Sequence, residues 1–207
     1  MERVNVVIAG VGGQGNMVAS EILATALARA GYRVSVGETF GASQRGGSVM
    51  SHVRAARDAT PGPLIPKGLA DVLLGFEPLE TLRLLAEYGR ETTRVVVNPR
   101  PLYPLVVQQG QATYPEPSDL LTKLAALAAE VLVVDATSLA RQAGDVRAQN
   151  LAMVGGLVGT GWLPLDAATV EQILTERFSD EMLHLNREAF RLGLDEVRST
   201  ALRAPPA

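Results

Sequence analysis

Short apolar runs alternate with longer stretches of helical spacing along the first two thirds of the chain. The run 4–10 is rich in β-branched residues and ends in a glycine, which predicts a buried strand. Apolar residues in 16–31 recur on one helical face up to a terminal glycine, which predicts a helix, and 34–36 predicts a second strand. A strand, a turn, a helix and a strand in this order form a βαβ unit, so we expect the sheet to be parallel here.

The same patterns predict the elements of the middle of the chain. Residues 48–54 alternate between apolar and polar, as in a half-exposed strand. Further strands are expected at 71–76, 95–97 and 131–135, and helices at 78–88 and 119–129. The prolines of 98–118 predict an irregular excursion, optionally with one edge strand.

From Ala136 onward the pattern is helical, and 180–203 is amphipathic. Residues 201–207 are expected to be a frayed tail. The chain is therefore predicted to be a single α/β domain over residues 1–200. It should hold a Rossmann-like, mostly parallel sheet flanked by helices, with a helical C-terminal region.

Composition excludes several classes of protein. The 207 residues carry a formal net charge of −3, so no broad basic surface for nucleic acid is expected. Cysteine is absent and there are two histidines, which argues against disulfides, a common zinc site or any other metal site, and iron–sulfur ligation by this chain. No apolar stretch reaches the roughly 18 residues of a membrane span, and the first apolar run is too short for a signal peptide. We expect a cytoplasmic protein without a membrane partner.

Glycines at the first, third and sixth positions of 10–15 follow a predicted strand and precede a predicted helix. Such glycines let backbone N–H groups approach a phosphate closely, and the helix N-terminus adds partial positive charge. The alternative is a turn that merely joins strand and helix. An NAD site would also require an acidic residue at the end of the second strand. Glu38 lies near that position, but another glycine-rich loop follows it directly.

That second loop, 38–48, is the most distinctive segment of the chain. Gln44 and Arg45 precede the pair Gly46-Gly47, and Ser48 opens the next strand. The guanidinium of Arg45 is a planar donor fork suited to phosphate or carboxylate. The alternative is a structural loop in which Arg45 pairs with an acidic neighbour, and the loop by itself favours neither interpretation.

Together the two loops resemble the gamma-type domain of the 2-oxoacid:ferredoxin oxidoreductases, and within that family the small subunits of the indolepyruvate-type enzymes. The resemblance rests on Gly-Val-Gly-Gly-Gln-Gly at 10–15 and Gln-Arg-Gly-Gly-Ser at 44–48. It extends to 51–54, 149–153 and 186–190 and so spans nearly the whole chain.

The resemblance implies a function in a larger enzyme. The family decarboxylates 2-oxoacids oxidatively on thiamine diphosphate, passes electrons through iron–sulfur clusters to ferredoxin and forms an acyl-CoA; here the 2-oxoacid would be indolepyruvate or another aryl pyruvate. The gamma-type domain is associated with coenzyme A. The resemblance implies no catalytic residue in this chain, and it implies coenzyme A contacts or subunit docking at these cofactor-binding residues: Gly10, Gly12, Gly13, Gln14, Gly15, Gln44, Arg45, Gly46, Gly47, Ser48 and Asn150.

The absence of cysteines and of a thiamine motif indicates that this chain needs a partner subunit. Without cysteines, and without the Gly-Asp-Gly and distant Asn of a thiamine motif, it cannot perform the redox reaction alone. We expect it to be inactive by itself and to work with a larger subunit that carries thiamine diphosphate and the clusters, reaching ferredoxin through the complex. The rival interpretations are a free-standing NAD(P)-dependent oxidoreductase and a purely structural interaction module.

A few other residues, among them the glycines of 155–161 and the two histidines, are expected to have structural roles or to lie at the surface. The glycines of 155–161 favour close packing of a helix over ligand contact. Asp135 is expected to cap the helix that follows it rather than to meet a ligand. His52 has no acidic partner nearby in sequence, which gives a hydrolase triad little support, and His184 is expected at the surface.

Overall fold

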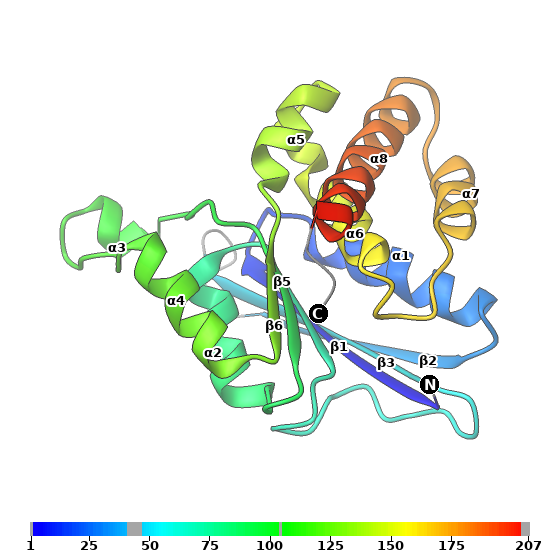
Figure 1. The fold of residues 1–207 in the computed structure, drawn as a ribbon, viewed down its shortest axis with the longest axis horizontal. Coiled ribbons are helices and arrows are strands. Elements are labelled where there is room, and N and C mark those ends of the chain that lie inside the picture. The colour runs from blue at the N-terminus through cyan, green and yellow to red at the C-terminus, as the bar shows by residue number, and fades with distance from the viewer. Residues whose placement is uncertain (1, 41–46, 104, 204–207) are drawn as a thin grey trace.

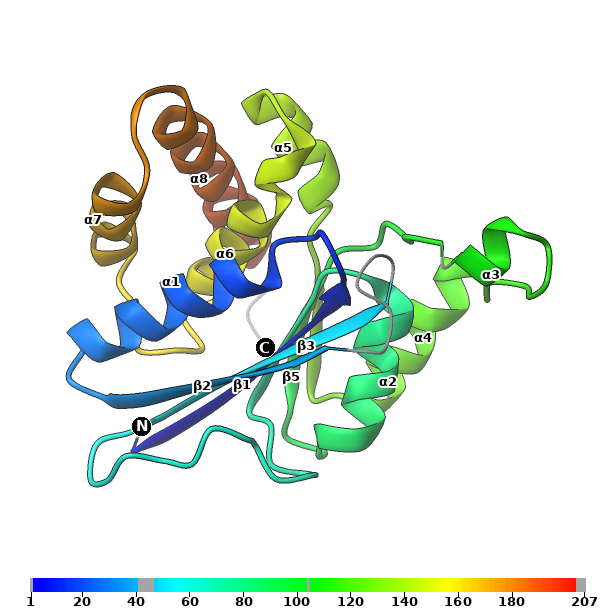
Figure 2. The same ribbon diagram turned by 180° about the vertical axis from the view of Figure 1, so that it is seen from behind.

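A computed structural model of the chain describes residues 2–40, 47–103 and 105–203. They form three layers, a twisted sheet with helices packed on both of its faces (Figures 1 and 2). The strands are β1 (Arg3–Val11), β2 (Arg33–Phe40), β3 (Ser48–Ala56), β4 (Val72–Gly75), β5 (Arg94–Val97) and β6 (Glu130–Val133). The helices are α1 (Asn16–Arg29), α2 (Pro78–Tyr88), α3 (Leu105–Gln108), α4 (Pro117–Leu127), α5 (Ala136–Ala143), α6 (Gln149–Gly159), α7 (Ala167–Arg177) and α8 (Asp180–Arg203), with a 3-10 turn at Val146–Ala148. The α/β fold with a helical C-terminal region is confirmed.

The sheet is mixed, with the strand order β2-β3-β1-β4-β5-β6. From β1 outward to β6 the three pairings are parallel, whereas β3 is antiparallel to both β1 and β2. The expectation of parallel pairing between the first two strands was therefore wrong. The physical reason is that β2 returns directly as β3, and this hairpin inserts its second strand beside β1. The two strands of the expected βαβ unit run in the same direction but are not neighbours.

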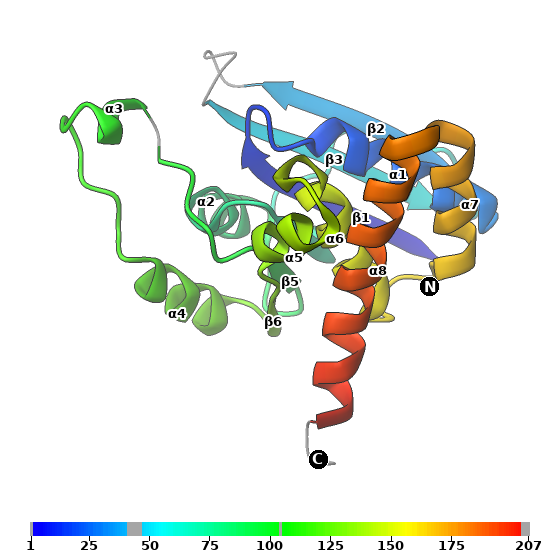
Figure 3. The same cartoon turned by 90° about the horizontal axis from the view of Figure 1, so that it is seen from above.

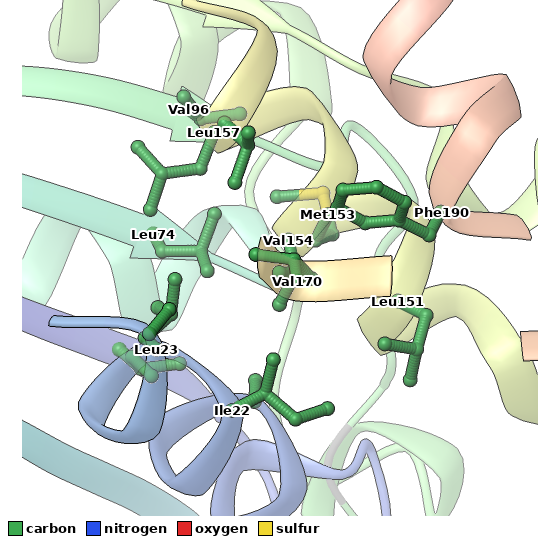
Figure 4. Packing of buried hydrophobic residues seen from close by; sticks show 14 of the residues in the cluster. Ile22, Leu23, Leu74, Val96, Leu151, Met153, Val154, Leu157, Val170 and Phe190 are labelled. Atoms are coloured by element: carbon green, nitrogen blue, oxygen red, sulfur yellow. The ribbon is translucent and has the colours of Figure 1, made fainter. Parts of the chain in front are cut away.

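Two apolar clusters hold the layers together, and β1 contributes to both. Its alternate side chains Val4, Val6 and Ile8 join the larger cluster, while Val7 and Ala9 join the smaller one on the other face. The larger cluster packs the sheet against α1, α5, α6, α7 and α8, and Figure 4 shows Leu74 and Val96 of the sheet facing Leu157 and Met153 of α6. The smaller cluster lies under α2 and α4. Burial on both faces explains why β1 is an almost uninterrupted apolar run.

Glycines set the contact between α6 and α8. A methyl group on Gly155 would overlap the carbonyl of Phe190, and one on Gly193 would overlap the carbonyl of Ala152. The two backbones therefore approach each other where neither helix carries a side chain. The expected packing role is confirmed for Gly155 and Gly159, where a Cβ would meet the backbone of α8. A Cβ on Gly156 would meet only side chains, and Gly161 follows α6 with a φ of 68° and ends it in the left-handed conformation.

The excursion between β5 and α4 carries the short helix α3 at its outer end, away from the sheet (Figure 3). Its described residues include no strand, so the optional edge strand is not found there. The excursion is fastened to the sheet by Tyr114, whose hydroxyl donates to the buried carboxylate of Glu77. The other carboxylate oxygen of Glu77 accepts from the backbone N–H of Glu80 at 2.8 Å and so caps α2.

His52 lies in β3 and is 1% exposed, against α2. Its Nδ1 accepts from the backbone N–H of Ile65 at 3.3 Å, and its ring meets Tyr88 edge-on. Burial, followed by the nearby charge of Arg54, lowers the pKa of His52 from its ordinary value of 6.5, and Glu87 opposes the shift. The folded chain thus holds a neutral imidazole where the unfolded chain takes up a proton.

This shift predicts a pH dependence of stability. Because the folded-state pKa is the lower one, the stabilisation by neutral His52 is present above pH 6.5 and is lost as pH falls below it. We expect the wild-type unfolding temperature to drop between neutral and mildly acidic pH, and to drop less in His52→Asn, which keeps an acceptor near Nδ1. His184→Asn, at an exposed position of α8, is the control. Equal acid sensitivity of His52→Asn and wild type would contradict this account.

Candidate functional site

The glycine turn, residues 11–15, joins β1 to α1 at the carboxyl edge of the sheet. Gly13 and Gly15 have φ values of 101° and 84°, which side chains rarely tolerate. No side chain caps α1, so the N–H groups of its first turn have no side-chain acceptor. This leaves a helix N-terminus suited to an anion, as the glycine pattern predicts.

Gln14 is buried inside the turn. Its Oε1 accepts from the N–H of Val11 at 2.8 Å, and its Nε2 donates to the carbonyl of Phe76 at 3.0 Å. The side chain thus ties the glycine turn to the end of β4. Gly10 is needed for the same packing, because a Cβ there would lie 2.6 Å from Asn16 Oδ1. Any ligand contact of Gln14 remains a prediction.

The last two residues of the second sequence motif lie beside the glycine turn. The N–H of Gly12 donates to the carbonyl of Gly47 at 2.9 Å, and Val11 pairs with Ser48 across β1 and β3. The inserted hairpin produces this proximity, because it brings the start of β3 to the end of β1. Gln44, Arg45 and Gly46 lie outside the described residues.

Asn150 reaches the turn from a distant part of the chain. It is buried near the start of α6, and its Nδ2 donates to the carbonyl of Gly15 at 3.4 Å. A Cβ on Gly15 would lie 2.5 Å from the same amide, so the glycine makes room for it. The structure therefore gathers Gly10, Gly12, Gly13, Gln14, Gly15, Gly47, Ser48 and Asn150 in one place.

A pocket of about 310 Å³ opens beside the turn on its β3 side. Gly12, Gly13 and Gly15 supply backbone, and the rest of the lining comes from Val11, Asn16, Met17, Val18 and Val49. Asn16 is 4% exposed, and its Oδ1 has no hydrogen-bond partner among the described residues. Met17, by contrast, is 49% exposed. Backbone amides beside apolar walls suit a ligand that combines phosphate with an apolar part. Sequence reasoning missed the Asn16, Met17 and Val49 part of this pocket, because these residues fit ordinary helix and strand patterns.

Glu38 is engaged within the protein. Its two carboxylate oxygens accept from the hydroxyls of Ser20 at 2.8 Å and Ser51 at 2.5 Å. A dinucleotide site needs an acidic residue free to accept from a ribose hydroxyl. Both oxygens of Glu38 already have donors, so it is poorly placed for that task.

Asp135 caps α5, as predicted. Its Oδ1 accepts from the backbone N–H of Ser138 at 3.0 Å, and Oδ2 pairs with Arg100 at 2.7 Å. Partial burial opposes ionisation, but the bonds from Arg100 and Ser138 outweigh it and lower the pKa of Asp135. His184 is exposed, as expected.

Neither a membrane span nor a metal cluster is found among the described residues. No helix in that part of the chain is both long and apolar enough to cross a bilayer. Groups of three or more acidic or histidine side chains that could hold an ion are likewise missing there.

Comparison with known proteins places this geometry in a family. The family model described as pyruvate ferredoxin/flavodoxin oxidoreductase matches residues 5–196. The indolepyruvate oxidoreductase subunit IorB of Archaeoglobus fulgidus is 39% identical over 197 residues, covering 95% of this chain and 96% of that protein. IorB of Thermococcus kodakarensis is 38% identical over 200 residues, covering 96% and 98%.

Solved structures share the fold. Pyruvate oxidoreductase subunit PORC of Thermotoga maritima gives a TM-score of 0.70 at 24% identity, over 94% of this chain and 97% of that one. A 2-oxoglutarate:ferredoxin oxidoreductase from Magnetococcus marinus gives a TM-score of 0.70 at 23% identity, and the match covers 100% of this chain but 32% of that one. The resemblance inferred from the two loops is thus confirmed. The chain belongs to the pyruvate ferredoxin/flavodoxin oxidoreductase family, as a small subunit of the 2-oxoacid:ferredoxin oxidoreductase type.

Proposed function

We propose that this chain contributes coenzyme A binding and subunit docking to an indolepyruvate-type 2-oxoacid:ferredoxin oxidoreductase of the cytoplasm. A larger partner subunit would hold thiamine diphosphate and the iron–sulfur clusters, oxidise an aryl pyruvate to the acyl-CoA and pass electrons to ferredoxin. The relatives named as indolepyruvate oxidoreductase subunits support the substrate class. The Magnetococcus marinus enzyme, whose structure holds coenzyme A, supports the ligand.

One observation carries the proposal: the bond of 2.9 Å from the Gly12 N–H to the Gly47 carbonyl. It joins the two loops on which the family resemblance rests, at the uncapped N-terminus of α1. The N–H groups in the first turn of α1 are suited to phosphate oxygens, and the apolar wall beside them suits the remainder of coenzyme A. The chain itself has no cysteine for a cluster, so its part is to bind and to position.

The proposal is tested at Gly13 in the reconstituted complex. A Cβ on Gly13 meets no protein atom within 4 Å, so alanine there projects into the space that a ligand would use. We expect Gly13→Ala to raise the KM for coenzyme A about tenfold, which corresponds to one lost charge-assisted hydrogen bond, with kcat nearly unchanged. Gly161→Ala is a matched control, because Gly161 also has a positive φ and open space around its Cβ position, away from the turn.

The controls separate the outcomes. Gly13→Ala should cost at least as much stability as Gly161→Ala, because a φ of 101° lies farther from the left-handed region that alanine can adopt than a φ of 68° does. Arg45→Ala should also raise the KM for coenzyme A. Unchanged coenzyme A kinetics in both Gly13→Ala and Arg45→Ala would contradict the coenzyme A proposal and favour a purely structural role for the chain. Tight, stoichiometric binding of NADH to the isolated chain would favour a dinucleotide site over the coenzyme A proposal.

A further inference from the structure

A polar cleft of about 280 Å³ lies on the β5 side of the glycine turn, across from the pocket on the β3 side. Its lining comes from several elements of the fold. These are the turn after β1 (Gln14), the segment after β5 (Arg100), α5 (Thr137 and Arg141) and the start of α6 (Gln149). The cleft thus follows the carboxyl ends of parallel strands. The helices after β1 and after β4 cover opposite faces of the sheet (Figures 1 and 2), so this edge is a topological switch point, where α/β proteins bind ligands.

Hydrogen bonds within the cleft fix the direction of its amide. Asn98 Nδ2 donates to the hydroxyl of Thr137 at 3.1 Å, and that hydroxyl donates to Gln149 Oε1 at 3.2 Å. The acceptor end of Gln149 is therefore used by the protein. Its Nε2 has no partner among the described residues and remains a free donor.

The cleft contains more positive charge than its acidic neighbours neutralise. Arg141 makes no hydrogen bond or ion pair within the described part of the chain, and its neighbour Arg100 uses Nε and Nη2 on Asp135, which leaves Nη1. Asp135 is committed to Arg100 and Ser138, and Asp145 to Arg147 at 2.7 Å. What remains for a ligand is a set of donors with net positive charge.

We propose that this cleft is a phosphate site, with Arg141 and Gln149 Nε2 as its principal donors and Arg100 Nη1 as a third. The three donors come from three separate chain segments, which suits a tetrahedral group with several oxygens better than a planar carboxylate. The phosphate can belong to a nucleotide or be a free inorganic ion. The site is separate from the glycine-turn pocket and does not depend on coenzyme A binding there.

The test is calorimetric titration of the full chain with inorganic diphosphate and, separately, with ADP. We expect diphosphate to bind, and Arg141→Gln to weaken it about tenfold by removing one charge-assisted contact. Gln149→Glu should abolish binding, because it replaces the free donor with a negative charge. Arg198→Gln removes an equal charge at an exposed position of α8 and should leave the affinity within about twofold of wild type. Circular dichroism confirms that each variant is folded.

Each result has a defined meaning. ADP binding that is tighter than that of diphosphate and equally sensitive to Arg141→Gln identifies a nucleotide phosphate, whereas diphosphate binding alone identifies a free ion. No heat with either probe at millimolar concentration, or unchanged affinity in Arg141→Gln, overturns the proposal. An Arg141→Gln variant that instead loses copurification with the larger subunit shows an interface residue and also overturns it. Gly13→Ala should leave diphosphate binding unchanged, so failure of the coenzyme A proposal would be seen separately.

Discussion

Replacing Gly155 or Gly193 with alanine is expected to lower the free energy of unfolding by about 1–3 kcal/mol at each position. A new methyl group would overlap the Phe190 carbonyl in the first case and the Ala152 carbonyl in the second. Backbone carbonyls within helices cannot rotate aside as a side chain can, so α6 and α8 must separate. Urea unfolding, followed by circular dichroism, measures the loss.

Gly156→Ala is the matched control on the same helix. Its Cβ would meet the side chain of Val134, with the nearest atom at 3.2 Å, and a side chain can shift. The gain in helix propensity, about 1 kcal/mol, offsets that contact, so the stability of this variant should stay within about 1 kcal/mol of wild type. If Gly155→Ala proved as stable as Gly156→Ala, the close backbone contact would not be what holds α8.

Tyr114→Phe is expected to destabilise the chain by about 1–3 kcal/mol, because it leaves a buried carboxylate oxygen of Glu77 without its donor. Burial raises the pKa of Glu77, and the Tyr114 hydroxyl opposes that shift. A raised folded-state pKa means that stability is present below the unfolded value and is lost as pH rises through the folded one. Removal of the hydroxyl raises the pKa further, so the cost should be larger at pH values where Glu77 must ionise.

Tyr103→Phe is the control, since Tyr103 touches the Tyr114 ring edge-on but is 48% exposed. It should change stability by no more than about 0.5 kcal/mol, as is usual for surface substitutions. Chemical unfolding of both variants at mildly acidic and mildly alkaline pH provides the comparison. A Tyr114→Phe cost that did not vary with pH would show that Glu77 does not depend on this hydrogen bond.

Local pattern predicts the elements of this fold better than their pairing. The apolar run of β1 and the one-sided apolar pattern of α1 are local properties, and both elements form where the pattern places them. The strand at 48–54 was expected to be half-exposed, but β3 has no exposed residue because it is paired on both sides and covered on both faces. Its position depends on which partner strands it finds, and the residues of 48–54 do not by themselves specify pairing with β1. The βαβ interpretation failed at that step because it assumed that strands consecutive around a helix become neighbours.

Some residues of the candidate site can likewise be recognised from local sequence, and others cannot. Glycine spacing marks a turn that needs positive φ, so Gly13 and Gly15 could be recognised from sequence. Asn16 and Arg141 could not be recognised, because each looks like an ordinary helix residue in the sequence. Only the fold shows that the Oδ1 of Asn16 has no partner and that the guanidinium of Arg141 lines the cleft without one among the described residues. Such roles arise from what neighbouring elements fail to supply.

The inserted hairpin also has a consequence for the order of folding. β2 and β3 adjoin in sequence, so their pairing closes a short loop, whereas β1 must find β4 across the separation from Val6 to Val72. Local antiparallel pairs form within microseconds, and non-local parallel pairs form more slowly. We therefore expect the β2–β3 hairpin to form first, with amide exchange slowing there before it slows where β1 pairs with β4. The contact between Gly12 and Gly47 would then form only when β1 docks against a hairpin that already exists.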